Sequence, residues 1–113
     1  MDLRWTPKPE VADQLEAELA GLSKALAHPA RLRILREVLA QGPCSCGHLT
    51  SALPLAQSTV SQHLKVLKQA GILEVEAGSG QGSYRLNPQA LIRYRTLVAT
   101  LTAQAPVTPQ ASS

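Results

Sequence analysis

Two cysteines separated by one residue are best suited in this sequence to bind an effector. Cys44 and Cys46 flank a serine, and His48 follows two residues later. Thiolates bind soft ions, so the pair favours thiophilic metals and metalloids over magnesium or calcium. Residues two apart lie on nearly opposite sides of a regular helix, so both thiols reach one ion only where the backbone is extended or distorted. Residues four apart share a helix face, which makes His48 a candidate third ligand beside Cys44.

The same two thiols allow two other interpretations. A disulfide or persulfide would make them a redox switch, because either bond would strain the turn that contains them. In the other interpretation both cysteines are small apolar residues that fill the core. Sensing through the thiols is favoured over packing alone, with no single effector preferred.

A second set of side chains is suited to contact the bases of DNA. Segment 57–70 has leucine and valine at helical spacing, which places them on one side of a helix. The other side carries the polar residues Gln57, Ser58, Ser61, Gln62 and Lys65. Glutamine can pair with adenine through two hydrogen bonds, and serine can donate to bases or phosphates. A lysine further along the helix can reach the phosphate backbone. The segment contains no acidic residue, whereas a solvated helix surface usually mixes both signs of charge.

Charge is distributed unevenly along the chain. The formal net charge is +3, but residues 23–70 carry six lysines and arginines against one glutamate, and residues 1–22 carry a net charge of −3. A basic middle region indicates a polyanionic partner such as nucleic acid, although solvated helix faces would also explain it.

Length and composition exclude several classes of protein. A chain of 113 residues has room for one domain, predicted at 9–102, between a flexible N-terminus (1–8) and a disordered tail (103–113). Hydrophobic residues make up 44% and charged residues 17%, which argues against disorder. No apolar run approaches a bilayer span, and the N-terminus has no secretory signal, so we expect a cytoplasmic protein without membrane contact.

The elements that position the candidate residues can be predicted from apolar spacing and helix breakers. Pro9 and Pro29 are expected to open helices, and Gly42 with Pro43 to end one. Gly71 is expected to cap the C-terminal end of helix 57–70 in a left-handed conformation. The predicted fold is mainly α with a small β-hairpin, in the order α-α-α-α-β-β-α: helices 9–27, 29–41, 46–53, 57–70 and 88–102, and strands 72–77 and 83–86.

This order resembles a winged helix-turn-helix domain. Helices 46–53 and 57–70 are joined by the short turn 54–56, and the hairpin with its glycine-rich loop 78–82 corresponds to the wing. A glycine-rich tip can follow the DNA backbone or minor groove closely. Gln81 and Arg85 are therefore predicted as further DNA contacts.

Three other polar residues are expected to serve the structure. His63 falls beside the apolar side of its helix, so a satisfied structural histidine is favoured over a metal ligand. His28 precedes Pro29 and is expected to mark a helix boundary. Arg31 falls within the apolar arc of its helix, which favours an internal partner or a stem lying along apolar surface over a DNA contact.

Three stretches resemble the ArsR/SmtB family of bacterial winged-helix repressors: KALAHPARLRIL at 24–35, LAQSTVSQHLKVLKQAGIL at 55–73 and SYRLN at 83–87. The resemblance covers most of the predicted domain. It implies a homodimer that binds a double-stranded DNA operator and releases it when an effector arrives. It also implies base contacts at the start of the recognition helix, where this sequence has Gln57, Ser58, Thr59, Ser61 and Gln62.

The resemblance also bears on the cysteines. Family members that sense arsenic, cadmium or lead carry Cys-x-Cys at this place, which implies As(III), Cd, Pb or Zn as an effector at Cys44, Cys46 and His48, with no cofactor required. This sequence departs from the family patterns, because no cysteine follows Cys46, residues 1–18 contain no Cys or His, and residues 88–104 contain no Asp, His or Glu. A two-thiol site remains, to be completed by His48, the partner chain or an added thiol.

The first and last helices carry apolar stripes that one small domain cannot fully cover. We assign these stripes to a homodimer interface, which would space two recognition helices on a palindromic operator. The predicted interface residues are Leu15, Leu19, Leu22, Leu91, Tyr94, Val98 and Leu101.

The function predicted from the sequence is a DNA-binding transcriptional repressor with thiol sensing. One alternative is the same repressor with structural cysteines, and another is a helical protein-interaction dimer without sequence-specific DNA binding. An enzyme is disfavoured, because the sequence has no catalytic triad, carboxylate pair or phosphate-binding loop.

Overall fold

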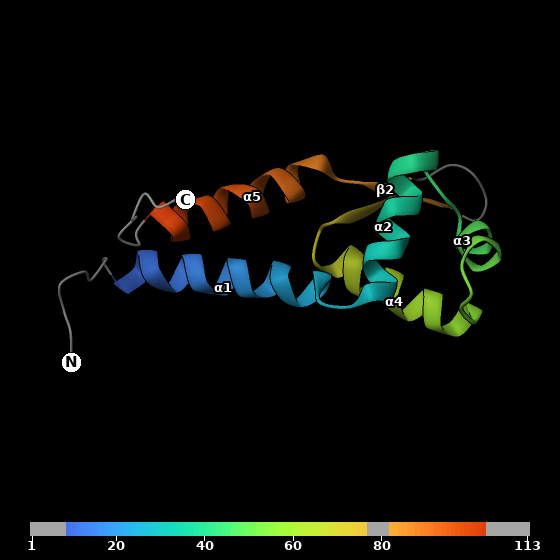
Figure 1. Ribbon diagram of the computed structural model, residues 1–113, viewed down its shortest axis with the longest axis horizontal. Coiled ribbons are helices and arrows are strands. Elements are labelled where there is room, and N and C mark those ends of the chain that lie inside the picture. The colour runs from blue at the N-terminus through green and yellow to red at the C-terminus, as the bar shows by residue number, and fades with distance from the viewer. Residues whose placement is uncertain (1–8, 77–81, 104–113) are drawn as a thin grey trace, which may run out of the picture.

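The protein consists of a helical body from which two long helices project (Figure 1). The structure is a computed structural model that describes residues 9–76 and 82–103, with side chains from residue 14. Its elements are α1 (Pro9–Leu26), α2 (Pro29–Gln41), α3 (Cys46–Ala52), α4 (Gln57–Gln69), β1 (Leu73–Glu76), β2 (Ser83–Leu86) and α5 (Pro88–Ala103). All seven predicted elements are confirmed, each ending within one residue of its prediction.

The predicted flexible N-terminus, and the tail from residue 104 onward, lie outside the described residues. Ala103, predicted to begin the tail, is the last residue of α5. None of the helices that the structure describes is long and apolar enough to cross a membrane.

The helix ends follow the predicted breakers. Pro29 occupies the first turn of α2, and His28 caps this helix by accepting a hydrogen bond at Nδ1 from the backbone N–H of Ala30 at 3.2 Å. Gly71 has φ of 78°, a left-handed conformation that glycine adopts without strain, and it follows the last turn of α4. The predictions for His28 and Gly71 are confirmed.

The core lies where α2, α3, α4 and the hairpin meet. Val60, Leu64 and Leu67 point from α4 into this core and are at most 1% exposed. They pack with buried side chains of the other elements, among them Ile34, Leu49, Ile72 and Leu73. Burial of this single apolar side orients α4 and leaves its polar side in solvent.

The hairpin is a two-stranded antiparallel sheet with a third short partner. Leu73 pairs with Leu86, and Glu74 pairs with Arg85. Cys44 adds an isolated bridge to Tyr84 of β2, with backbone N–O distances of 2.9 and 2.7 Å. The sequence pattern did not predict this bridge, which ties the segment before α3 to the wing.

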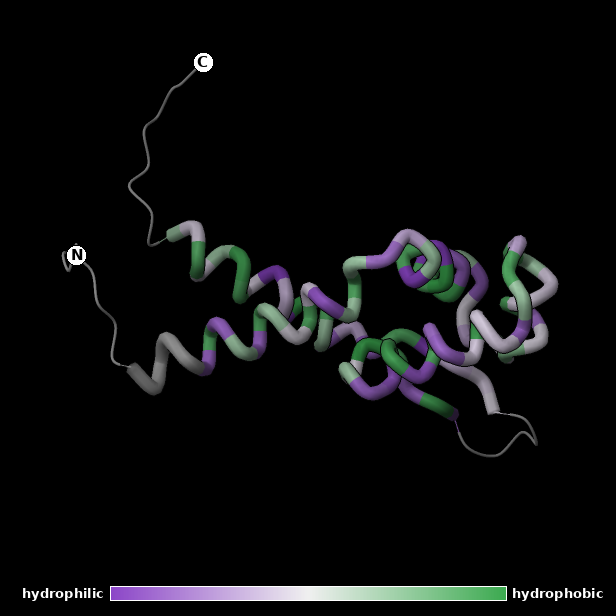
Figure 2. Tube along the Cα trace, turned by 90° about the horizontal axis from the view of Figure 1, so that it is seen from below, coloured by the Kyte–Doolittle hydropathy of each residue, from purple (hydrophilic) through white to green (hydrophobic). Residues whose placement is uncertain are grey.

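The helices α1 and α5 run antiparallel and side by side away from the body (Figure 1). Arg93 of α5 and Glu18 of α1 form a two-pronged ion pair, with N–O distances of 2.8 and 2.7 Å. Tyr94 Oη lies 3.1 Å from Ser23 Oγ. Apolar and polar residues alternate along the coloured parts of both helices (Figure 2). Ile92, Val98 and Leu101 of α5 are exposed, so apolar surface remains after the two helices have packed together.

Candidate nucleic-acid interface

The polar side of α4 forms an exposed surface. Gln57, Ser58, Ser61, Gln62 and Lys65 are all exposed, and Thr59 is half-buried. The opposite side of the same helix is fixed in the core, so this surface has a defined orientation. Short polar side chains on a rigid helix are suited to approach base edges in a major groove. DNA contact by these six residues remains a prediction.

The turn between α3 and α4 completes a helix-turn-helix. Ser45 caps α3, its hydroxyl accepting from the backbone N–H of His48 at 3.0 Å. Leu49 is the buried residue of this short helix and anchors it to the core. The segment Leu53 to Ala56 joins α3 to α4. This is the arrangement that presents a recognition helix to DNA.

A buried histidine fixes the back of α4. His63 is 9% exposed, and its Nδ1 accepts a hydrogen bond from Nε of Arg31 at 3.2 Å. Burial lowers the pKa of His63, and the neighbouring His28 and Arg31 lower this pKa further. The predictions of a structural His63 and an internal partner for Arg31 are confirmed.

Arg85, the predicted DNA contact on the wing strand β2, forms ion pairs with two carboxylates. Arg85 donates to Glu74 Oε1 from Nε and Nη2, at 3.2 and 3.1 Å, and its Nη1 lies 3.5 Å from Glu76 Oε2. A phosphate would therefore have to compete with two exposed carboxylates for this guanidinium. The prediction that Arg85 contacts DNA did not include these partners, because strand register was not predicted. Gln81, the other predicted wing contact, lies outside the described residues.

The two cysteines occupy different environments. Cys44 is 3% exposed, and its thiol donates to the carbonyl of Gly42 at 3.2 Å. Burial raises the pKa of Cys44, and the carboxylate of Glu37 raises this pKa further. Cys46 is half-buried in the first turn of α3, and its Sγ lies 3.5 Å from the hydroxyl of Ser61 on α4.

The predicted shared helix face of Cys44 and His48 is wrong. The helix begins only at Cys46, because Ser45 is the extended N-cap with φ of −79° and ψ of 161°. His48 instead pairs with Glu37 of α2, with 2.8 Å between Nε2 and Oε2. Among residues that the structure describes, no three Cys, His, Asp or Glu side chains group as metal ligands would. The three candidate ligands are therefore neighbours that do not form a preformed metal site.

Comparison with known proteins decides the family. A family model for a helix-turn-helix domain matches residues 26–76. A biofilm growth-associated repressor from Agrobacterium fabrum is 43% identical over 86 residues, which cover 76% of this chain and 72% of the relative. The solved structure of an ArsR-like transcriptional regulator from Rhodococcus sp. RHA1 matches with a TM-score of 0.72 and 27% identity, over 79% of this chain and 83% of that one.

The chain belongs to the ArsR family of winged-helix transcriptional regulators. A homodimeric winged helix-turn-helix DNA-binding domain from Mycobacterium bovis supports the fold, with a TM-score of 0.65 and 24% identity over 96% of this chain and 100% of that one. The protein is thus a DNA-binding regulator and not an enzyme. Membership of the ArsR family favours DNA binding over the alternative of an interaction module that does not bind DNA.

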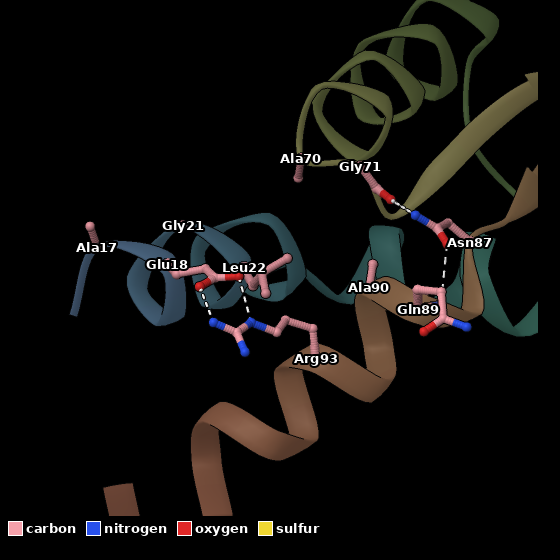
Figure 3. Close-up of a pocket in the computed structure, with 10 residues that line it drawn as sticks. All are labelled: Ala17, Glu18, Gly21, Leu22, Ala70, Gly71, Asn87, Gln89, Ala90 and Arg93. Carbon is pink, nitrogen blue, oxygen red and sulfur yellow. Dashed lines mark hydrogen bonds and ion pairs between the residues drawn. The ribbon is translucent and has the colours of Figure 1, made fainter. Parts of the chain in front are cut away.

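This ArsR-family regulator also has a cleft next to the C-terminal end of the recognition helix α4 (Figure 3). The cleft measures about 460 Å³ and lies between α1, the corner that joins α4 to β1, and the first turns of α5. Glu18 and Arg93 form their ion pair at its edge, and Asn87 Nδ2 donates to the carbonyl of Gly71 at 3.0 Å. Half of its lining consists of the small residues Ala17, Gly21, Ala70, Gly71 and Ala90.

Proposed function

We propose that the protein is a repressor that binds a palindromic operator as a homodimer and leaves it when a thiophilic ion or a thiol-reactive compound acts at Cys44 and Cys46. The observation that carries the DNA-binding part is the exposed side of α4, which combines serine, glutamine and lysine and has no acidic residue. A bacterial operator would make the cytoplasm its place of action.

The projecting helices support the homodimer. Val98 and Leu101 of α5 are 38% and 50% exposed, and they lie three residues apart on one side of the helix. The predicted interface residues Leu15, Leu19, Leu91 and Tyr94 are half-buried and pack against the core. Leu22 is only 8% exposed within the single chain, so this predicted interface residue has little surface left for a partner. A second copy that covers the remaining apolar surface would place two recognition helices symmetrically.

Separate substitutions on α4 should distinguish base contacts from phosphate contacts. Gln62→Ala is expected to reduce the preference for operator over random DNA by about 1–3 kcal/mol, the value of a direct base contact. Lys65→Ala is expected to weaken both DNAs alike and to flatten the salt dependence, because fewer counterions are released. Fluorescence anisotropy with both duplexes at several salt concentrations measures both effects.

Glu16→Ala on α1 is a suitable control, since this exposed residue lies on a different helix from the proposed base contacts. If Lys65→Ala changed only the preference between duplexes while Gln62→Ala weakened both equally, the assigned roles would be reversed. Equal affinity of the unaltered protein for every duplex would contradict operator recognition itself.

The thiol segment contacts both parts of the proposed DNA-binding surface. The side chain of Cys46 approaches Ser61 on α4, and the backbone of Cys44 is paired with Tyr84 on β2. Both thiols can reach one ion only where the backbone between them is extended or distorted, and the backbone at Ser45 is extended. A soft ion that replaces both thiol protons, or a bond between the two sulfur atoms, would move this segment and with it the recognition helix or the wing.

Replacement of both thiols should remove the response to the effector. The double variant Cys44→Ser/Cys46→Ser is expected to bind operator nearly as tightly as the unaltered protein and to stay bound when arsenite, cadmium, lead, zinc or an oxidant is added. His48→Ala should weaken a response to metal and leave a response to oxidant intact, because only the metal uses an imidazole ligand. Operator release is followed by anisotropy during each titration. Normal release from the double variant would show that the cysteines are packing residues.

A further inference from the structure

One arginine links three helices behind the recognition surface. From α2, Arg31 donates through Nη1 to the carbonyls of Lys24 and Ala25 at the end of α1, at 3.1 and 3.2 Å. Through Nε it donates to Nδ1 of His63 on α4. Pro29 offers Ala25 O no N–H, and Lys24 O already accepts from the N–H of Ala27 at 3.3 Å, so the guanidinium supplies a further donor to this end of α1 while it contacts α4. This side chain therefore joins α4 to the end of α1, in addition to the core packing that orients α4.

The link requires an uncharged imidazole at His63. Nδ1 of His63 accepts from Arg31, so this nitrogen cannot carry a proton. The ring centre of His28, whose own Nδ1 accepts from the backbone N–H of Ala30, lies 4.5 Å from that of His63. Protonation of His63 at Nδ1 would remove the acceptor and place a cation against the guanidinium and beside His28. The hydrogen bond between Arg31 and His63 can therefore form only while His63 is neutral.

Among the described side chains, no ion pair supplies an opposite charge to compensate for such a proton. The groups that act on His63 are His28, which caps α2, and Arg31 of α2, and α1 contributes backbone carbonyls through Arg31. Within residues 14–76 and 82–103, none of the ion pairs joins a carboxylate to any of these three side chains. A proton added here would therefore be opposed by the positive charge of Arg31.

We propose that Arg31 and His63 are positioning residues for DNA binding, which hold the recognition helix α4 against α1 through a neutral imidazole, so that protonation of His63 weakens the complex with operator. This inference rests on the proposed operator binding through α4. His63 lies on the buried side of the helix, opposite Gln62 and Lys65, so its effect on DNA passes through the placement of α4.

The sign of the pH effect distinguishes this role from ordinary electrostatics. A proton added close to phosphates would strengthen DNA binding, because it adds positive charge. Protonation of His63 is expected to weaken binding at a pH below 6.5, since burial, His28 and Arg31 lower the pKa of His63 from that value. The stability of the fold changes with pH in the same direction. His63 of an unfolded chain takes up its proton at a higher pH than His63 of the folded chain, so stability falls as the pH drops below 6.5.

The test measures operator affinity against pH at constant salt, with a labelled duplex selected from a random-sequence pool. The unaltered protein is expected to lose severalfold, and at most about tenfold, in affinity between about pH 8 and pH 5.5, because one proton taken up by a group whose pKa lies below 6.5 cannot shift the equilibrium further at that pH. His63→Asn places an amide oxygen near the position of Nδ1 and cannot titrate, so it should bind well at both pH values. Arg31→Met should bind weakly at both.

Further measurements keep the test independent of folding defects in the variants. Circular dichroism and sedimentation at each pH show whether the protein stays folded and keeps its oligomeric state. In the unaltered protein, nitrogen NMR of the imidazole rings should show that affinity falls as His63 takes up its proton. Arg31→Lys, which offers a single nitrogen to three acceptors, should give an intermediate affinity.

The outcomes separate this inference from the function on which it rests. A His63→Asn protein that keeps the full acid loss, or an affinity loss that follows a group other than His63 in the NMR titration, would overturn the positioning role. Unchanged binding by folded Arg31→Met would overturn it as well. Failure of the unaltered protein to prefer any duplex at neutral pH would contradict operator recognition itself.

Discussion

Val98→Glu is expected to convert the dimer into monomers and to abolish operator binding at concentrations where the unaltered protein is dimeric. Val98 lies on the exposed apolar side of α5 with Leu101. In a two-fold symmetric dimer each copy contributes the same surface, so one substitution places two carboxylates in the interface. Burial of an unpaired charge costs at least about 2–3 kcal/mol for each chain, which weakens dimerisation by several orders of magnitude.

Ile92→Glu provides a matched control on the same helix. Ile92 is 45% exposed, close to the 38% of Val98, but it points away from the side that carries Leu91 and Val98. Sedimentation should show a dimer for Ile92→Glu and a monomer for Val98→Glu. If Val98→Glu stayed dimeric at low micromolar concentration, this side of α5 would not be the interface, and the operator would have to be bound in another arrangement.

The sequence predicted the elements well because local residues decide where they begin and end. Pro29 and Gly71 fix the ends of α2 and α4 through backbone geometry that acts within a few residues. The amphipathic spacing of α4 likewise determines which side is buried. These signals need no knowledge of what lies across the molecule, and each was confirmed.

Contacts between distant segments were harder to predict from the sequence. The wing register sets Arg85 opposite Glu74, and the bridge of Cys44 to Tyr84 joins residues forty positions apart. Neither pairing is indicated by a periodic pattern of residues, because the register depends on how the two strands come together. Arg31 is an intermediate case. Its place in an apolar arc indicated an internal partner, but only the packed helices identify that partner as His63.

Leu49→Ala is expected to destabilise the domain more than any single change on its DNA-binding surface. The helix α3 has seven residues, too few for independent stability, so packing must hold it in place. Leu49 is its buried residue and is 0% exposed in the core. Truncation of a buried leucine costs about 2–5 kcal/mol, since apolar contact is lost and a cavity remains.

Leu39→Ala is the control for this change, because Leu39 on α2 is 59% exposed and its truncation should alter stability by at most about 0.5 kcal/mol. Both free energies of unfolding are measured by urea titration at the same protein concentration, since the proposed dimerisation would contribute to stability. Equal losses for the two variants would show that a partner covers the outer side of α2. A small loss for Leu49→Ala alone would show that α3 is held by its caps and by the Cys44 bridge. With the expected large loss, α3 is positioned from the core through Leu49, while the buried side of α4 holds the recognition helix against it.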